Sequence, residues 1–192
     1  SYLFADDTGI LQRGKTVNGI TTDSNGVITK RQLSVKYISQ SGFPTGCESA
    51  SAVMLLQNAG YNVSVADFVD KYLDKGGFTW KNGIQYGPDP NSKFVGDPRS
   101  SSGFGCYAPV LTKAMNKILG NGKTAKNLTG TAFTSLLTDY IDKGIPVAVW
   151  ASINMVNVDN GRQWVIPETG QLFTWKRHEH CLVLVGYDAE YY

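Results

Sequence analysis

Apolar residues recur at helical spacing in one part of the chain and in short, strand-like runs in another. The helical stretches, most of which end next to a glycine, predict helices over residues 45–58, 63–73, 106–119 and 130–143. The alternating or continuous apolar runs predict strands over residues 32–39, 147–150, 163–166, 172–175 and 181–185. Because helices come mainly first and strands mainly afterwards, we expect an α+β fold with an antiparallel β-sheet.

The first predicted helix follows a loop that contains Gly42 and Pro44. Thr45 and Glu48 have the spacing of a capping box, which predicts that the helix begins at Thr45. Cys47 then lies in the first helical turn, where unpaired N–H groups and the helix dipole favour an anion. A thiol in this place is biased toward the nucleophilic thiolate, whereas the alternative is a small buried apolar residue.

The chain has two histidines, His178 and His180, and both lie far downstream of Cys47. His180 opens an apolar run that ends at Gly186 and is interpreted as a buried strand. A cysteine at a helix start and a histidine at the mouth of a buried strand are typical of a cysteine hydrolase. Gln40 precedes the thiol by seven residues, and its amide is a candidate oxyanion donor.

Three cysteines leave at least one thiol unpaired within the chain, and a disulfide between Cys106 and Cys181 stays open. No two cysteines have the spacing of metal ligands. On a strand, His178 and His180 would share one face, while Glu179 and Cys181 would point the other way. We therefore predict no metal site and no cofactor, and we do not expect Cys181 to be the thiol that His180 serves.

Composition adds limits on the class of protein. A chain of 192 residues, 42% of them hydrophobic, is one domain of ordinary size with room for an appendage and a sizeable core. A net charge of +2 with mixed signs gives no electrostatic case for nucleic acid. No apolar run approaches the roughly 20 residues that span a bilayer. Because the chain starts at Ser1 without a methionine or signal peptide, we expect a processed or trimmed product.

Residues 1–30 contain an internal repeat with an offset of 17 residues. Residues 6–11 and 23–28 each have an Asp-x-x-Gly turn that enters a short apolar strand, which predicts two small hairpin-like units. We expect this segment to be separate from a domain over residues 31–192. Further along, the Gly- and Pro-rich stretch 78–105 is interpreted as an ordered excursion that walls a substrate cleft, or as a packed surface loop without function.

Several blocks that resemble one family follow each other along the chain: Gln40 and residues 46–48, 86–90, 95–98, 105–110, 144–147 and 179–188. The family is that of the bacterial papain-fold cysteine peptidases akin to the bacteriocin leader-processing peptidases, family thirty-nine of the cysteine peptidases. The secreted or surface-attached branch is the most similar, over about residues 32–192. The resemblance implies a papain-like fold, a Cys47–His180 pair, Gln40 in the oxyanion hole, and a peptide or protein substrate.

The family orients its histidine with an aspartate on the strand after the histidine strand. Asp188 lies roughly 26 Å from His180 along an extended strand and cannot serve. If residues 188–190 form a hairpin turn, the position facing His180 falls at about 196, beyond Tyr192. We therefore expect the domain to be truncated at its C-terminal end. Asn154 is a weaker candidate, since papain itself uses an asparagine.

The N-terminal segment resembles the tandem cell-wall-binding repeats of Gram-positive surface proteins, on the residues Tyr2, Phe4, Gly9, Leu11, Gly14, Asn18 and Gly19. The alternative is that these hairpins only pad the edge of the domain. The resemblances imply an extracellular or cell-surface location and three functions to distinguish. These are a cysteine peptidase, a peptidoglycan amidase or endopeptidase with the same dyad, and a catalytically inactive module that binds the wall or a partner.

Overall fold

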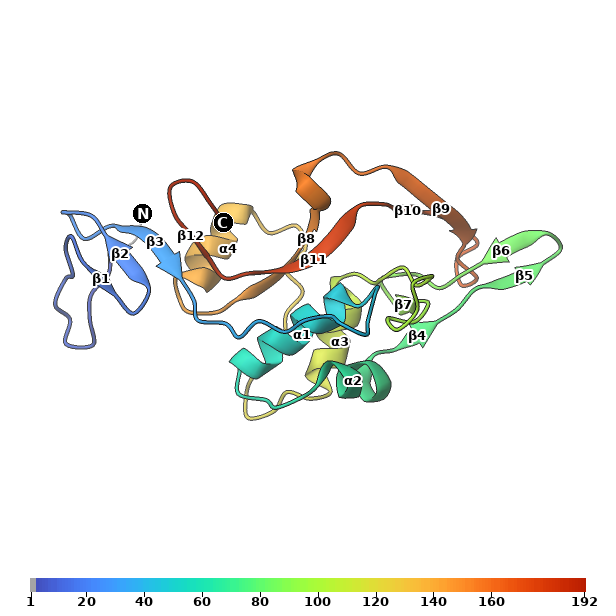
Figure 1. Ribbon diagram of the computed structural model, residues 1–192, viewed down its shortest axis with the longest axis horizontal. Coiled ribbons are helices and arrows are strands. Elements are labelled where there is room, and N and C mark those ends of the chain that lie inside the picture. Colours follow the sequence, from blue (N-terminus) through green and yellow to red (C-terminus); the bar gives the residue numbers. More distant parts are fainter. Residues whose placement is uncertain (1–2) are drawn as a thin grey trace. The chain divides into compact units, whose positions relative to one another are not determined.

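The computed structural model describes residues 3–192 and divides the chain into two units (Figure 1). The first, here the repeat-bearing unit, comprises Ser1–Lys36, Gly130–Val147 and Val183–Tyr192. The second, the cysteine-bearing unit, comprises Tyr37–Thr129 and Ala148–Leu182. The division expected from the sequence, into a segment 1–30 and a domain 31–192, remains a prediction. Tyr2, one of the residues on which the resemblance to cell-wall-binding repeats depends, lies outside the described residues.

The repeat-bearing unit contains an antiparallel sheet in the order β1-β2-β3-β12 (Figure 1). Its strands are β1 (Thr16–Val17), β2 (Ile20–Thr22), β3 (Ile28–Gln32) and β12 (Gly186–Tyr187). The unit also holds the short helix α4 (Phe133–Leu136), which continues into the π-helical turn η2 (Leu137–Ile141). Arg31 of β3 donates from Nε to the carbonyl oxygen of Ile141 over 3.3 Å, so the N-terminal strands are hydrogen-bonded to residues far downstream.

The predicted repeat is visible as two equivalent turns. Asp6 Oδ1 accepts the N–H groups of Thr8 and Ile10, each at 3.0 Å. Asp23 Oδ1 accepts the N–H groups of the residues two and four positions further on, at 2.8 and 2.9 Å. A short aspartate side chain commonly fixes a turn in this way. The prediction of a duplicated Asp-x-x-Gly turn is confirmed.

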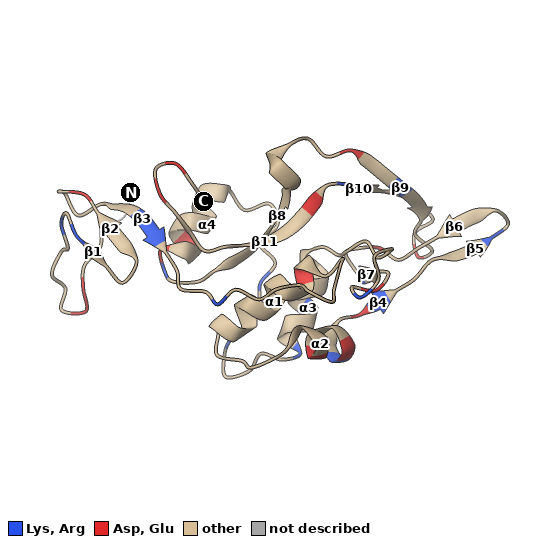
Figure 2. Cartoon of the chain, in the orientation of Figure 1, with Lys and Arg blue, Asp and Glu red and all other residues tan. Residues whose placement is uncertain are grey.

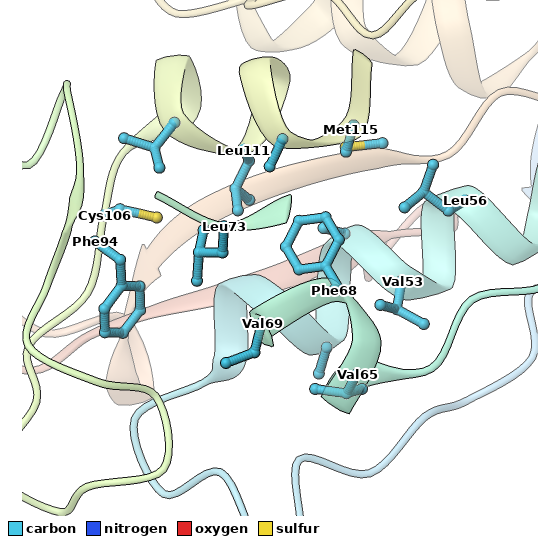
Figure 3. Packing of buried hydrophobic residues seen from close by; sticks show 14 of the residues in the cluster. Val53, Leu56, Val65, Phe68, Val69, Leu73, Phe94, Cys106, Leu111 and Met115 are labelled. Carbon is cyan, nitrogen blue, oxygen red and sulfur yellow. The ribbon is translucent and has the colours of Figure 1, made fainter. Parts of the chain in front are cut away.

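In the cysteine-bearing unit, α1 (Cys47–Asn58) and α3 (Ala108–Asn116) pack together with α2 (Val65–Asp67) and its π-helical extension η1 (Phe68–Tyr72). Ser64 caps α2, because its side chain accepts the N–H of Asp67 at 3.0 Å. Figure 3 shows the apolar core between these helices. The largest buried side chains in this core are Phe68 and Phe94, and the others include Val53, Leu56, Val69, Cys106, Leu111 and Met115.

The remaining strands of this unit form small sheets. β4 (Lys75–Gly76) pairs with β7 (Phe94–Val95), and a second sheet has the order β10-β9-β6-β5. The members of the second sheet are β5 (Thr79–Lys81), β6 (Ile84–Tyr86), β9 (Asn160–Val165) and β10 (Leu172–Lys176). β9 and β10 contain most of the strands predicted over residues 163–166 and 172–175, and they pair as an antiparallel hairpin. Aromatic rings pack around Trp164, which is 1% exposed, and Phe78 and Phe104 fix both ends of the stretch 78–105 in this cluster. Residues 79–84, between these two ends, are exposed.

The strand that contains His180 belongs to a separate two-stranded sheet. β8 (Val147–Ser152) pairs with β11 (Glu179–Leu184), and the 3-10 turn η3 (Ile153–Met155) follows β8. Acidic and basic residues are spread over both units in Figure 2, and both signs occur together around α2. Among residues 3–192, every helix is too short or too polar to span a bilayer.

The mixed α+β class is confirmed, but several details of the prediction are wrong. The sheet is not purely antiparallel, since β4–β7 and β6–β9 are parallel pairs and strands also occur between the helices. The expected strand over residues 32–39 ends at Gln32 instead. Its apparent alternation does not mark a buried face, because Leu33 is buried while Tyr37 is 78% exposed.

Candidate active site

Cys47 lies in the first turn of α1, as predicted, and is its first residue, but the predicted capping box is absent. Gly46 occupies the N-cap position and makes no side-chain cap. The Thr45 hydroxyl donates instead to the carbonyl oxygens of Asp97 and Ser100, at 3.2 and 3.0 Å. The helix therefore begins two residues later than expected, and Glu48 is free to make other contacts.

Strand β11 is bound to α1 through the backbone of one residue, Cys181. The N–H of Cys181 donates to the Cys47 sulfur at 3.5 Å, and the carbonyl oxygen of Cys181 accepts from the Ser51 hydroxyl at 3.2 Å. Cys47 and Ser51 are one helical turn apart, so one face of α1 contacts both backbone groups of Cys181. The half-buried His180 directly precedes Cys181, so the structure brings its backbone next to the Cys47 thiol.

Glu48 is a site residue that sequence reasoning missed as such. Its side chain is 0% exposed. Oε1 accepts the N–H of Cys106 at 2.9 Å, and the Cys47 thiol donates to Oε2 at 3.3 Å. A Cβ atom on Gly105 would overlap Oε1, so the close approach requires glycine there. The signal in the sequence was a charged residue directly after the candidate nucleophile in a helix that was expected to be buried.

The electrostatics of Cys47 differ from the expectation of a thiolate. Burial raises the pKa of the Cys47 thiol far above its ordinary value, and the charge of Glu48 raises it further. The hydrogen bond from the Cys181 N–H acts in the opposite direction and lowers the pKa, but it does not compensate. The prediction that the helix start biases Cys47 toward thiolate is therefore wrong for this resting arrangement, because burial and a neighbouring carboxylate outweigh the dipole.

Two carboxyl groups near the thiol bind protons more tightly than usual. Burial raises the pKa of Glu48 to about 7. Burial and the charge of Glu48 raise the pKa of Glu179 to about 8. Glu179 Oε2 is buried and has no hydrogen-bond partner among residues 3–192. A buried carboxyl without partners is most stable when it is neutral.

The other two cysteines are thiols in the core. In the part of the chain that the structure describes, Cys47, Cys106 and Cys181 are all free, so the open disulfide between Cys106 and Cys181 is not formed. Cys106 is 0% and Cys181 is 2% exposed. Burial raises the pKa of both thiols, which leaves Cys47 as the most accessible sulfur of the three.

Gln40 lies in the loop before α1, as expected. Its Nε2 donates to the carbonyl oxygens of Phe43 and Pro44, each at 3.4 Å. These long bonds hold the amide over the turn that leads to Cys47. Within residues 3–192, the Gln40 amide makes no hydrogen bond to Cys47.

The remaining candidates have other surroundings. His178 lies in a turn with φ 63°, outside β11, so the prediction that it shares a strand face with His180 is wrong. The distance from His178 Nε2 to Asp159 Oδ2 is 3.6 Å.

Asp188 forms the expected turn, in which its side chain accepts the N–H groups of residues 190 and 191. Over residues 3–192 no hydrogen bond or ion pair reaches the His180 imidazole, from Asn154 or elsewhere, and no group of three His, Cys, Asp or Glu could hold a metal ion.

Comparisons with known proteins agree with this mixed α+β fold. The uncharacterized protein YvpB of Bacillus subtilis (strain 168) is 30% identical over 146 residues, which is 76% of this chain. The chain spans 55% of the length of that relative. A crystal structure of a Bacillus anthracis protein assigned as a C39-like peptidase is 29% identical, with a TM-score of 0.72 over 84% of this chain and 79% of the other.

The family match covers most of the chain. Residues 32–192 match the Peptidase_C39 like family, and they include Gln40, Cys47 and His180. The likeness to the solved structure extends over a similar share of the molecule and has the same mixed α+β class. The chain therefore belongs to the Peptidase_C39 like family.

Proposed function

We propose that this chain is a papain-like cysteine peptidase in which Cys47 is the nucleophile, His180 the general base and Gln40 an oxyanion donor. One observation carries the proposal: the peptide that follows His180 is hydrogen-bonded to the Cys47 sulfur, at 3.5 Å. A nucleophile and its base must lie within reach of each other, although this contact often tightens only when substrate binds. Family membership supports a peptide substrate.

The reaction follows from these roles. The Cys47 proton moves to His180 as the sulfur attacks the peptide carbonyl, and the imidazolium then gives that proton to the leaving amine. The result is an acyl-enzyme, which water hydrolyses. Proton transfer during attack suits a thiol that is uncharged at rest.

The developing oxyanion needs donors. The Cys47 N–H at the start of α1 is one, and the Gln40 amide is the other once it turns away from the carbonyl oxygens that it contacts at 3.4 Å. A single donor of this kind is worth about 3 kcal/mol in transition-state stabilisation. We expect Gln40→Ala to lower kcat by roughly two to three orders of magnitude with little effect on KM.

The test is acylation of the protein by an electrophilic peptide probe. Cys47→Ala should abolish labelling, and His180→Ala should slow it, since the sulfur then has no base. Glu168→Gln, an exposed carboxyl in the β9–β10 turn, is the matched control and should label like the parent protein. Unchanged labelling of the Cys47→Ala variant would contradict the assignment.

A second candidate function uses the same dyad on cell-wall peptides, as an amidase or endopeptidase at the cell surface. The duplicated aspartate turns at Asp6 and Asp23, in the segment that resembles cell-wall-binding repeats, motivate it. Release of soluble peptides from purified Gram-positive walls would favour this function, whereas cleavage of unfolded protein alone would favour a protein peptidase. A third candidate, an inactive binding module, predicts that the probe labels neither the parent protein nor any variant.

A further inference from the structure

Glu48 and Cys47 are joined by a hydrogen bond. The thiol donates to Oε2 at 3.3 Å, and Oε1 is fixed by the N–H of Cys106 at 2.9 Å. Gly105 permits this close approach of the carboxyl, because a Cβ atom at that position would overlap Oε1. One oxygen of a fully buried carboxyl is therefore held toward the sulfur.

We infer that Glu48 is a further catalytic residue of the proposed peptidase, because its carboxyl accepts a hydrogen bond from the Cys47 thiol and so keeps the sulfur mostly uncharged at rest, until the proton moves to His180 during attack. The inference rests on the proposed role of Cys47 as nucleophile. When the proton lies on sulfur, Cys47 is a thiol beside a carboxylate. When it moves to Oε2, Cys47 is a thiolate that accepts a hydrogen bond from a carboxylic acid, and the net charge of the pair is unchanged.

The surroundings oppose a second negative charge in the pair. From α1 the carboxyl meets Cys47, and from the segment that enters α3 it meets Cys106 and Tyr107. From β11 it interacts with Glu179 and Cys181. Within the described chain no lysine or arginine pairs with Glu48. Two buried anions in contact are unfavourable, so the pair should lose its protons in two well-separated steps.

The experiment measures the rate of Cys47 alkylation by iodoacetamide against pH, with the modified peptide identified by mass spectrometry. The parent protein should show a first, small rise near neutral pH and a second rise in strongly alkaline solution. Glu48→Gln can still accept the Cys106 N–H through its amide oxygen, and its amide N–H can donate to the Cys47 sulfur, but the side chain cannot become charged. In this variant we expect the alkylation rate to rise in a single step, at a lower pH than the second step of the parent protein. Near neutral pH, alkylation should be roughly tenfold faster than in the parent protein, which corresponds to a thiol pKa lower by about one.

Two matched variants distinguish the effect of the Glu48–Cys47 hydrogen bond from the effect of any nearby negative charge. Glu179→Gln removes a nearby negative charge that makes no hydrogen bond to Cys47, so it should speed alkylation less than Glu48→Gln and keep the two-step profile. Glu168→Gln should change nothing. Equal profiles for Glu48→Gln and the parent protein would overturn the inference, and so would equal acceleration by Glu179→Gln.

A second measurement needs no change at Glu48 and therefore does not depend on whether that variant folds. Alkylation of Cys47 removes the donor of the bond to Oε2, and the buried carboxylate should then take up a proton. Infrared difference spectra of the parent protein near neutral pH should show a new carboxylic acid band after alkylation. An unchanged carboxyl region would contradict the inference.

The two proposals fail in different ways. His180→Ala tests the dyad, because it should slow peptide-probe acylation while leaving the two-step alkylation profile that Glu48 causes. If His180→Ala acylates like the parent protein, the proposed function is wrong. If only the Glu48→Gln result is negative, the dyad stands and the role of Glu48 is wrong.

Discussion

At the scale of single residues, a carboxyl without exposed surface lies directly beside the candidate nucleophile. Glu48 follows Cys47 in the sequence, yet its side chain turns into the protein and reaches the N–H of Cys106. Buried charges are costly unless they are paired, and here the partners are a thiol and one peptide N–H. The chain retains a residue that burial alone would disfavour, which is the pattern expected of a functional group.

The raised pKa values of Glu48 and Glu179 should make the free energy of unfolding fall as the pH rises. A carboxyl whose pKa is higher in the folded than in the unfolded chain stabilises the fold below its unfolded pKa, and this contribution is lost as pH rises through the folded pKa. The window runs from the ordinary glutamate pKa of 4.5 to about 7 for Glu48 and about 8 for Glu179. A pKa that is higher by one in the folded chain corresponds to about 1.4 kcal/mol in the free energy of unfolding.

Urea unfolding at intervals between about pH 4.5 and pH 8 checks this prediction. The parent protein should lose stability across the window, and Glu179→Gln should lose clearly less. Glu168→Gln should follow the parent protein. A flat profile for the parent protein, or the same slope in Glu179→Gln, would show that these carboxyls do not titrate as described.

At the scale of elements, the decisive contact is the one between α1 and β11. Two side chains on one face of α1 bind the backbone N–H and the carbonyl oxygen of Cys181, and this fixes the position of the strand along the helix. The strand is otherwise paired only with β8 in the described sheets. The helix, and not a wide sheet, therefore determines where His180 lies.

Ser51→Ala should consequently destabilise the protein by about 1–2 kcal/mol, since it leaves the buried carbonyl of Cys181 without its donor. It should also slow acylation by the peptide probe, because β11 loses its second contact with α1. The matched control is Ser49→Ala. Ser49 is also buried on α1, but its hydroxyl has no partner among residues 3–192, so its removal should be neutral or stabilising. Equal effects of the two substitutions on the free energy of unfolding would contradict this role.

At the scale of the whole molecule, the N-terminal strands are part of a unit that also contains residues from the middle and the end of the chain. β3 pairs with β12, and Arg31 bonds the carbonyl oxygen of Ile141. A chain that lacks residues 1–32 would leave β12 without its neighbour. Such a truncation should therefore lower the hydrogen-exchange protection of residues 133–141 and 186–187.

A truncation of residues 1–15 is the control for this prediction. It removes the first aspartate turn but leaves β1, β2 and β3 intact, so residues 133–141 should stay protected. Equal protection in both truncated chains would show that the N-terminal strands are an independent appendage, as a simple division at residue 30 implies.

The helices and the hairpin of the fold could be predicted because their apolar periodicity reports directly on burial. Residues 32–39 misled, since alternation of apolar residues predicts a strand only if one face is covered, and Tyr37 is exposed. The parallel pairs β4–β7 and β6–β9 join segments that are distant in sequence, and short strands carry no local signal of their partners. The π-helical turns in η1 and η2 likewise replaced regular helix without a local signal.

The site could be predicted in part. Cys47 at a helix start and His180 on a strand were recognisable from the types of residue and their elements. The charge state of the Cys47 thiol could not be predicted, because it depends on where the Glu48 side chain points. The capping-box spacing of Thr45 and Glu48 predicted that this side chain would turn back toward the start of the helix, which is wrong. Thr45 bonds the carbonyl oxygens of a distant loop, and only the folded chain brings them within reach.

The proton that Cys47 keeps has a consequence for the durability of the protein. Peroxides and disulfides react with thiolates and hardly at all with thiols, so a nucleophile that is uncharged at rest is slow to become a sulfenic acid or a mixed disulfide. If Cys47 is the nucleophile, as proposed, the hydrogen bond from its thiol to Glu48 would also protect the sulfur from oxidation while no substrate is bound. The same bond that slows attack on a substrate would then slow the reaction with peroxides.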